Sequence, residues 1–161
     1  MLLSAHKTDP VIVGHTACII NNLSLSKNRQ RIIESPCVEG LLQTLLSTDI
    51  QEDSLHYVTF CLAELAKQEG ATLCMVQWMD EPLTNCLVRL AGWLEHPELC
   101  FQAASIIYHM MGHEKMMLLL KQHIEEIQAY LTNFLIHPEI RFQQLGISTF
   151  CRLREGVYVL P

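Results

Sequence analysis

Two histidines lie four residues apart in the segment His109-Met-Met-Gly-His113, a spacing that could place two zinc ligands on one helical face. A metalloprotease helix needs a glutamate directly after the first histidine as its general base, and Met110 stands there instead. Gly112 is also expected to end the helix before His113. We therefore interpret the pair as surface or capping histidines. A metal-dependent helical domain or enzyme using the His109/His113 region stays as the alternative function.

The seven cysteines are an odd number, and no two of them form Cys-x-x-Cys. Most lie on apolar helical faces, where a free thiol behaves as a small hydrophobe. This usage indicates a reduced cytoplasmic or nuclear protein rather than a disulfide framework. The sequence contains no glycine-rich phosphate loop and no Gly-x-Ser-x-Gly elbow. No catalytic residue, cofactor or metal ligand is therefore predicted, and a non-enzyme is expected.

The composition excludes several classes of partner. Half of the 161 residues are hydrophobic and 17% are charged, which is typical of a folded domain rather than a disordered tail. The net charge of −6 gives no electrostatic footprint for nucleic acid, and the basic residues Lys27, Arg29 and Arg31 are interpreted as a solvated turn. No apolar run approaches the ~20 residues of a membrane span. We expect neither membrane insertion nor direct nucleic-acid binding.

The elements that carry these residues are predicted to be helices, because apolar residues recur with the helical period of about 3.6 along the chain. Aliphatic residues dominate, while glycine and proline cluster at segment ends, so the predicted fold class is all-α. The expected helices cover about 10–25, 28–35, 37–46, 54–70, 71–79, 83–94, 97–111, 114–121, 123–136 and 138–154.

An internal repeat organises these helices. The segment His96-Pro-Glu-Leu-Cys-Phe-Gln102 recurs as His137-Pro-Glu-Ile-Arg-Phe-Gln143, an offset of 137 − 96 = 41 residues. Upstream, Asn22-Leu23 aligns with Glu64-Leu65 (offset 42) and then with His109-Met110 (offset 45). These offsets fall within the ~40–47 residues per unit of helical repeat proteins.

The first unit resembles the armadillo repeat. It contains Asn22-Leu23-Ser24 at the end of a long helix, then Asn28-Arg29 with Ile32 and Ile33, then Leu41 to Ser47. The resemblance implies a right-handed α-solenoid of about three armadillo-like repeats forming one domain over residues 1–155. Its units would be about 9–53, 54–96 and 97–137, with a final helix at 138–154 and a coil tail at 156–161.

The resemblance also implies a binding surface, because third helices of successive armadillo units line a concave side. Nuclear-import adaptors of the family present a Trp and an Asn there, four residues apart. The positions matching the Asn hold Asn22, Glu64, His109 and Phe150, and those matching the Trp hold Cys18, Phe60, Ser105 and Gly146. Because none of these four positions holds a Trp, an amphipathic helix or extended apolar segment is expected rather than a basic localisation peptide. The predicted partner-binding residues are Asn22, Phe60, Glu64, Ser105, His109 and Phe150.

Two of the aromatic residues allow two interpretations. Phe60 and Phe150 are either apolar anchors for the partner or core residues, whereas Trp78 and Trp93 are expected in the core. The predicted function is a non-enzymatic protein–protein interaction module or scaffold that binds a partner peptide or helix. Apolar faces expected at both ends of the solenoid favour a larger complex, a longer array or an oligomer.

Overall fold

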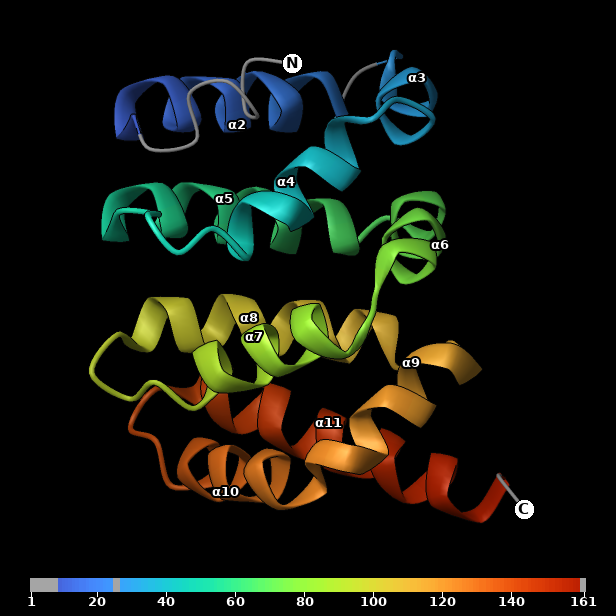
Figure 1. Cartoon of the computed structure of the whole chain (residues 1–161). Helices are drawn as coiled ribbons and strands as arrows, with labels where there is room; N and C mark the ends of the chain where they lie inside the picture. Colours follow the sequence, from blue (N-terminus) through green and yellow to red (C-terminus); the bar gives the residue numbers. More distant parts are fainter. Residues whose placement is uncertain (1–8, 25–26, 160–161) are drawn as a thin grey trace.

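The computed structural model describes residues 9–24 and 27–159, and this part of the chain is helical without a strand. The all-α prediction is confirmed. The elements, shown in Figure 1, are α2 (Pro10–Ser24), α3 (Arg29–Ile33), α4 (Cys37–Leu45), α5 (Glu52–Ala66), α6 (Glu69–Trp78), α7 (Glu81–Ala91), α8 (Pro97–Met110), α9 (Glu114–Leu120), the 3₁₀ turn η1 (Lys121–His123), α10 (Ile124–Leu135) and α11 (Ile140–Val159).

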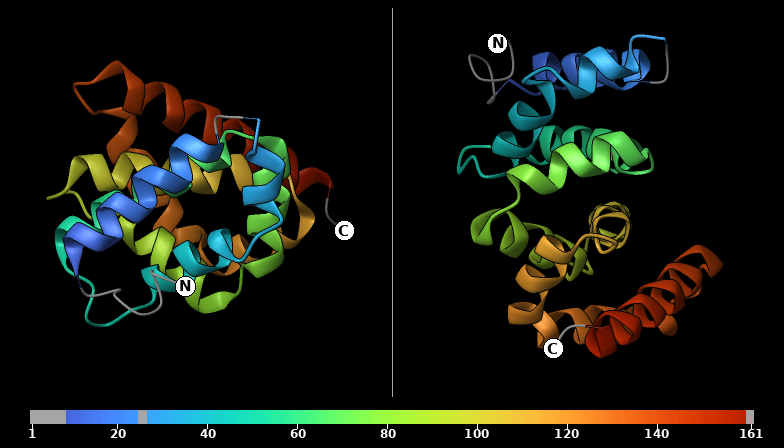
Figure 2. Two further views of the ribbon diagram at one scale, coloured as in Figure 1. Left: turned by 90° about the horizontal axis from the view of Figure 1, so that it is seen from above. Right: turned by 90° about the vertical axis from the view of Figure 1, so that its right-hand side faces the viewer.

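The helices stack in three rows. The long helices α2, α5, α8 and α11 pack in succession, and α4, α7 and α10 form a second row beside them. A third row begins with α3 on α6 and continues to α9, whose Lys115 Nζ donates to the Gln77 carbonyl of α6 at 2.9 Å. The chain passes from the α2 end to the α11 end of the stack (Figures 1 and 2). Each unit therefore packs mainly on the unit before it.

Polar contacts between units recur at similar sequence separations. In each row, a cysteine thiol donates to a backbone carbonyl of the corresponding helix one unit earlier. These bonds join Cys61 to Ala17, Cys74 to Ile33 and Cys86 to Leu45, across 44, 41 and 41 residues. Arg152 continues the pattern by donating to the Tyr108 carbonyl, 44 residues earlier. The spatial period therefore matches the repeat offsets found in the sequence.

Side-chain caps fix where two of the helices begin. Asp9 Oδ1 accepts the backbone N–H groups of Val11 and Ile12 at 3.0 and 3.3 Å, so α2 begins at Pro10 as the Asp-Pro pair predicts. Asp80 Oδ1 accepts the Leu83 N–H at 2.9 Å and begins α7 in the same way. Such a cap contributes about 1 kcal/mol, because it satisfies a backbone donor that has no partner within the helix.

The core lies between the rows and is apolar. Helix α4 shows why its sequence folds this way: its buried residues include Val38, Leu41, Leu42 and Leu45, which form one helical stripe. Toward the other end, the largest fully buried side chains are Tyr130 and Phe134 of α10 and Phe142 of α11. Their rings pack edge-on or tilted at centroid distances of 5.4 and 4.9 Å. These aromatic rings hold α11 against the rest of the stack.

Tyr130→Phe is expected to raise the free energy of unfolding by about 1 kcal/mol. The Tyr130 hydroxyl is buried and has no hydrogen-bond partner among the residues that the structure describes. Folding therefore removes it from water without compensation, and phenylalanine avoids that cost. Urea denaturation measures the change, with exposed Tyr57→Phe as the control expected near zero. A Tyr130→Phe variant less stable than the wild type would contradict the prediction.

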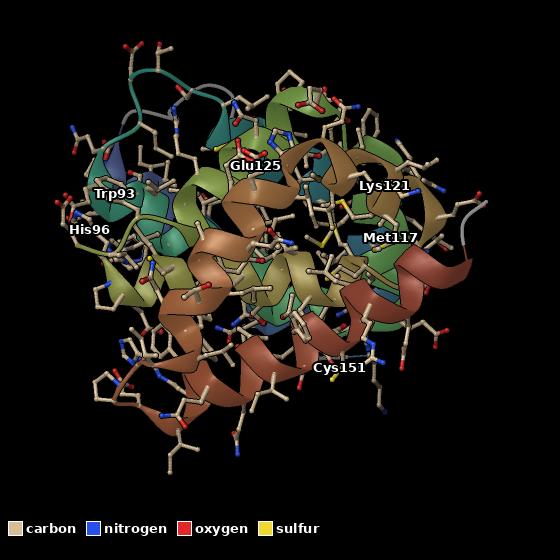
Figure 3. The ribbon with its side chains drawn as sticks, turned by 90° about the horizontal axis from the view of Figure 1, so that it is seen from below. Trp93, His96, Met117, Lys121, Glu125 and Cys151 are labelled. Atoms are coloured by element: carbon tan, nitrogen blue, oxygen red, sulfur yellow. The ribbon has the colours of Figure 1, made fainter. Side chains whose placement is uncertain are left out.

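Two expected boundaries are wrong. Helix α5 ends at Ala66, and Gly70, expected to end it, lies in the first turn of α6 without a positive φ. The tail expected as coil from residue 156 continues α11 to Val159, and residues 160–161 lie outside the described part. A Cβ on Gly156 would collide with Met117, which lies beside the C-terminal part of α11 in Figure 3. Glycine at position 156 therefore leaves room for the end of the Met117 side chain.

Candidate functional site

The outward side of α5 is the centre of the predicted binding surface. Tyr57, Phe60 and Glu64 lie three and four residues apart and therefore share one side of the helix. Tyr57 and Phe60 are each 47% exposed and Glu64 is half-buried, whereas Val58 and Leu62 on the other side are fully buried. Phe60 is thus a surface aromatic, and the core interpretation of this residue does not hold.

Helix α2 extends this surface at one end. It packs on α5 through Ala17, whose carbonyl accepts the Cys61 thiol at 3.3 Å, and through Gly14. A Cβ on Gly14 would lie 2.9 Å from the Tyr57 ring, so the missing side chain lets this ring lie on α2. Cys18 and Asn22, four residues apart, are exposed and share a side of α2.

Helix α8 contributes less exposed surface to the predicted binding site than the sequence predicts. Ser105 is only 6% exposed. Helices α5, α7 and α11 pack against α8 and cover the small side chain of Ser105. His109 is half-buried, and its Nδ1 lies 2.7 Å from the Ser105 carbonyl oxygen. The imidazole ring is therefore held close to its own helix, and little of Ser105 can reach a partner.

Phe150 lies elsewhere. Arg152 faces α8: it donates to the Tyr108 carbonyl at 2.7 Å, and its guanidinium carbon lies 4.0 Å from the Tyr108 ring centroid. Helical residues advance by about 100° each, so Phe150 points some 200° away from Arg152. It shares a side of α11 with Gly146, where a Cβ would lie 3.1 Å from Phe134 of α10. It is 53% exposed and therefore not a core residue, but it belongs to the end of the stack.

We call the surface formed by Cys18, Asn22, Tyr57, Phe60, Glu64 and His109 the long-helix face. Of the six predicted residues, the structure brings Asn22, Phe60 and Glu64 onto this face and places His109 at its border. Ser105 is covered, and Phe150 is separate. Glu64 forms an ion pair with Lys67, the residue that follows α5, so its charge is partly neutralised. Tyr57 was missed, although its spacing of three from Phe60 places it on the same side.

The two tryptophans are not in the core as expected. Trp78 is 43% exposed and lines a groove of about 570 Å³ beside α3 and α6. Trp93 is 37% exposed and lines a groove of about 560 Å³ beside α7 and the 47–50 segment. Each follows or ends a short helix at the edge of its row, so one side of the indole lacks a covering neighbour. The helical period alone does not reveal such an edge.

The His109/His113 pair lacks further ligands in the described part of the chain. His113 precedes α9 at its N-terminal cap, after α8 has ended at Met110. Across residues 9–24 and 27–159, three potential ligand atoms come together only at Glu52, His56 and His96. The sequence does not reveal this cluster, because its members come from two units.

Cysteine reactivity is expected to divide by location. Burial raises the pKa of the Cys61 thiol to about 12 and that of Cys100 to about 11, so both are almost fully protonated at pH 8. Because the thiolate is the nucleophile, both should react with an aromatic disulfide reagent at least about 10-fold more slowly than exposed Cys18 and Cys151. Mass mapping of labelled peptides over time measures the order. Early labelling of Cys61 in folded protein would contradict it.

No protein-family model and no curated protein matches this chain. None of the helices in the described part is long and apolar enough to cross a membrane. The features from which a function can be inferred are therefore the long-helix face, the two tryptophan-lined grooves and the Glu52–His56–His96 cluster.

Proposed function

We propose that this protein is a non-enzymatic interaction module, built as a right-handed armadillo-like solenoid, that holds a peptide or helix of a partner protein on its long-helix face. Two observations support the solenoid. The helices form three rows, and hydrogen bonds from cysteine thiols to carbonyls of the preceding unit recur at separations of 41–44 residues. A stack of this kind presents equivalent side chains of successive units along one surface, which suits an elongated partner.

The observation that carries the proposal is the pair of exposed aromatic rings, Tyr57 and Phe60, in the middle of the face. Aromatic side chains supply much of the binding energy in protein interfaces, because they bury a large area at a small cost in conformational entropy. Neither ring is needed to fill the core below, where Val58 and Leu62 already do so. The rings are therefore available to a partner.

Polar groups on either side of the rings define the kind of partner. Asn22 offers an amide donor and acceptor that can pair with the backbone of an extended segment. Glu64, already paired with Lys67, adds only a weak preference for a basic or hydroxyl-bearing residue. The face therefore suits a segment with apolar anchors, either an amphipathic helix or an extended strand.

Site-specific crosslinking tests this function. A photoreactive phenylalanine analogue at position 60 should capture a defined protein in cells, identified by mass spectrometry and reproduced with the purified partner. The same analogue at Glu126, exposed on α10 in another row, is the matched control and should capture little. Equal capture at both positions, or capture only at position 126, would reject the long-helix face.

A further inference from the structure

Glu52, His56 and His96 form a cluster between two successive units. Glu52 is the first residue of α5, His56 follows one turn later on the same side, and His96 immediately precedes α8. His96 Nδ1 lies 3.1 Å from Glu52 Oε1, and His56 Nε2 lies 4.0 Å from the same oxygen. All three potential ligand atoms lie within 4.8 Å of one another.

Small side-chain rotations would bring these three atoms to the distances of a zinc site. Zinc bonds of ~2.0–2.1 Å in a tetrahedron place neighbouring ligand atoms roughly 3.4 Å apart. The two separations that involve Glu52 lie on either side of this value, and Glu52 is exposed, so a rotation of its carboxylate would equalise them. The two imidazole nitrogens lie within 4.8 Å of each other, and rotation of the His56 ring toward His96 would close that distance. Two imidazoles and one carboxylate are also a ligand set that zinc accepts, with solvent in the fourth position.

The position of His96 is not a consequence of the repeated His-Pro-Glu motif. In the second copy, His137 Nδ1 accepts the Glu139 backbone N–H at 3.1 Å, and its ring stacks on Phe142. His96 makes no such capping bond. Its Nδ1 faces Glu52 instead, so the histidine of this copy makes a contact between α5 and α8.

Neighbouring side chains hold the His96 ring in place. The Trp93 ring lies 4.2 Å from it, centroid to centroid, and Trp93 Nε1 donates to Glu95 at 3.0 Å. Figure 3 shows Trp93 and His96 side by side at the edge of the molecule. A ligand whose orientation is already fixed by packing loses less entropy on binding a metal.

We propose that Glu52, His56 and His96 bind one zinc ion, which joins the start of α5 to the start of α8. Bound zinc would link two successive units at this edge and stabilise the stack, because it binds the folded arrangement and not the separated helices. The proposal is independent of the long-helix face and of its partner.

Titration of the untagged full chain with zinc tests the site by calorimetry. One ion per chain is expected, with Glu52→Gln and His56→Ala each weakening the affinity at least 10-fold. A double variant, His109→Ala with His113→Ala, is the matched control and should bind as the wild type does. Circular dichroism shows whether each variant is folded, and conservative Glu52→Gln keeps the test valid if His56→Ala unfolds.

The fluorescence of Trp93 provides a second measurement, which reports whether zinc binds near His96. In a Trp78→Phe background, Trp93 is the one remaining tryptophan of the sequence. Its fluorescence should change with zinc and saturate at one equivalent, and Glu52→Gln should shift the midpoint at least 10-fold. Absence of zinc binding, equal affinity in Glu52→Gln and wild type, or loss of binding in the His109/His113 control would each overturn the proposal.

Discussion

Phe142→Ala is expected to lower the free energy of unfolding by about 3–5 kcal/mol, the cost of removing a fully buried aromatic ring. Phe142 lies where α8, α10 and α11 meet. Its ring centroid is 5.2 Å from Phe101 and 4.9 Å from Phe134, and His137 stacks on it at 3.8 Å. Alanine would leave a cavity that three separate helices cannot easily close. Urea denaturation followed by circular dichroism measures the loss.

The matched control is Phe150→Ala, the same substitution on the same helix. Because Phe150 is more than half exposed, its loss should change the stability by less than about 1 kcal/mol. Hydrogen exchange should also show that Phe142→Ala loosens α10 and α11 before α2 and α5, since units of a stack depend mainly on their neighbours. Similar losses of stability for Phe142→Ala and Phe150→Ala would contradict the prediction.

The regular part of this fold follows directly from local patterns. The period of 3.6 predicts the helices, and Asp9-Pro10 marks the start of α2, where Asp9 caps the first turn. The repeated His-Pro-Glu segment predicts a unit of about 41 residues. This is the separation at which two cysteine thiols donate to backbone carbonyls of the preceding unit. Such features need only nearby residues, so the sequence alone is enough to find them.

The orientation of Phe150 could not be found in the same way. Aligning the two His-Pro-Glu segments assumes that their helices begin at equivalent residues, but α8 begins at Pro97 and α11 begins at Ile140. The later start goes with the His137 ring capping the Glu139 N–H. The contact between Arg152 and Tyr108 joins the two helices at an offset of 44 residues, three more than the motif offset of 41. Three residues turn a side chain by about 300°, so the motif alignment does not give the direction of Phe150. The exact phase of a helix depends on its packing partners, not on the motif.

The metal-like cluster and the tryptophan-lined grooves depend on contacts between units. Glu52 and His56 form an ordinary i, i+4 pair on a helix, and only the stacking of α8 on α5 brings His96 to them. Trp93 is exposed because it follows α7 at the edge of its row. Sequence periodicity gives the apolar side of a helix but not which part of that side a neighbouring unit covers.

Phe60→Ala is expected to weaken the binding of the partner captured at position 60. The loss of binding free energy should be about 2 kcal/mol, which is roughly a 30-fold rise in the dissociation constant. The change should leave the stability within about 1 kcal/mol, because Phe60 is half exposed and the core beneath it is filled by Val58 and Leu62. Calorimetry with the purified partner measures the affinity, and Leu118→Ala, an exposed apolar residue on α9, is the control that should bind normally. Asn22→Ala should weaken binding more modestly, through a lost amide pair.

If Phe60→Ala and Asn22→Ala both bind as tightly as the wild type while folded, the partner is held elsewhere. The exposed indoles of Trp78 and Trp93 are the next anchors to remove, because they alone among the tryptophans and phenylalanines of the described residues line the two large grooves.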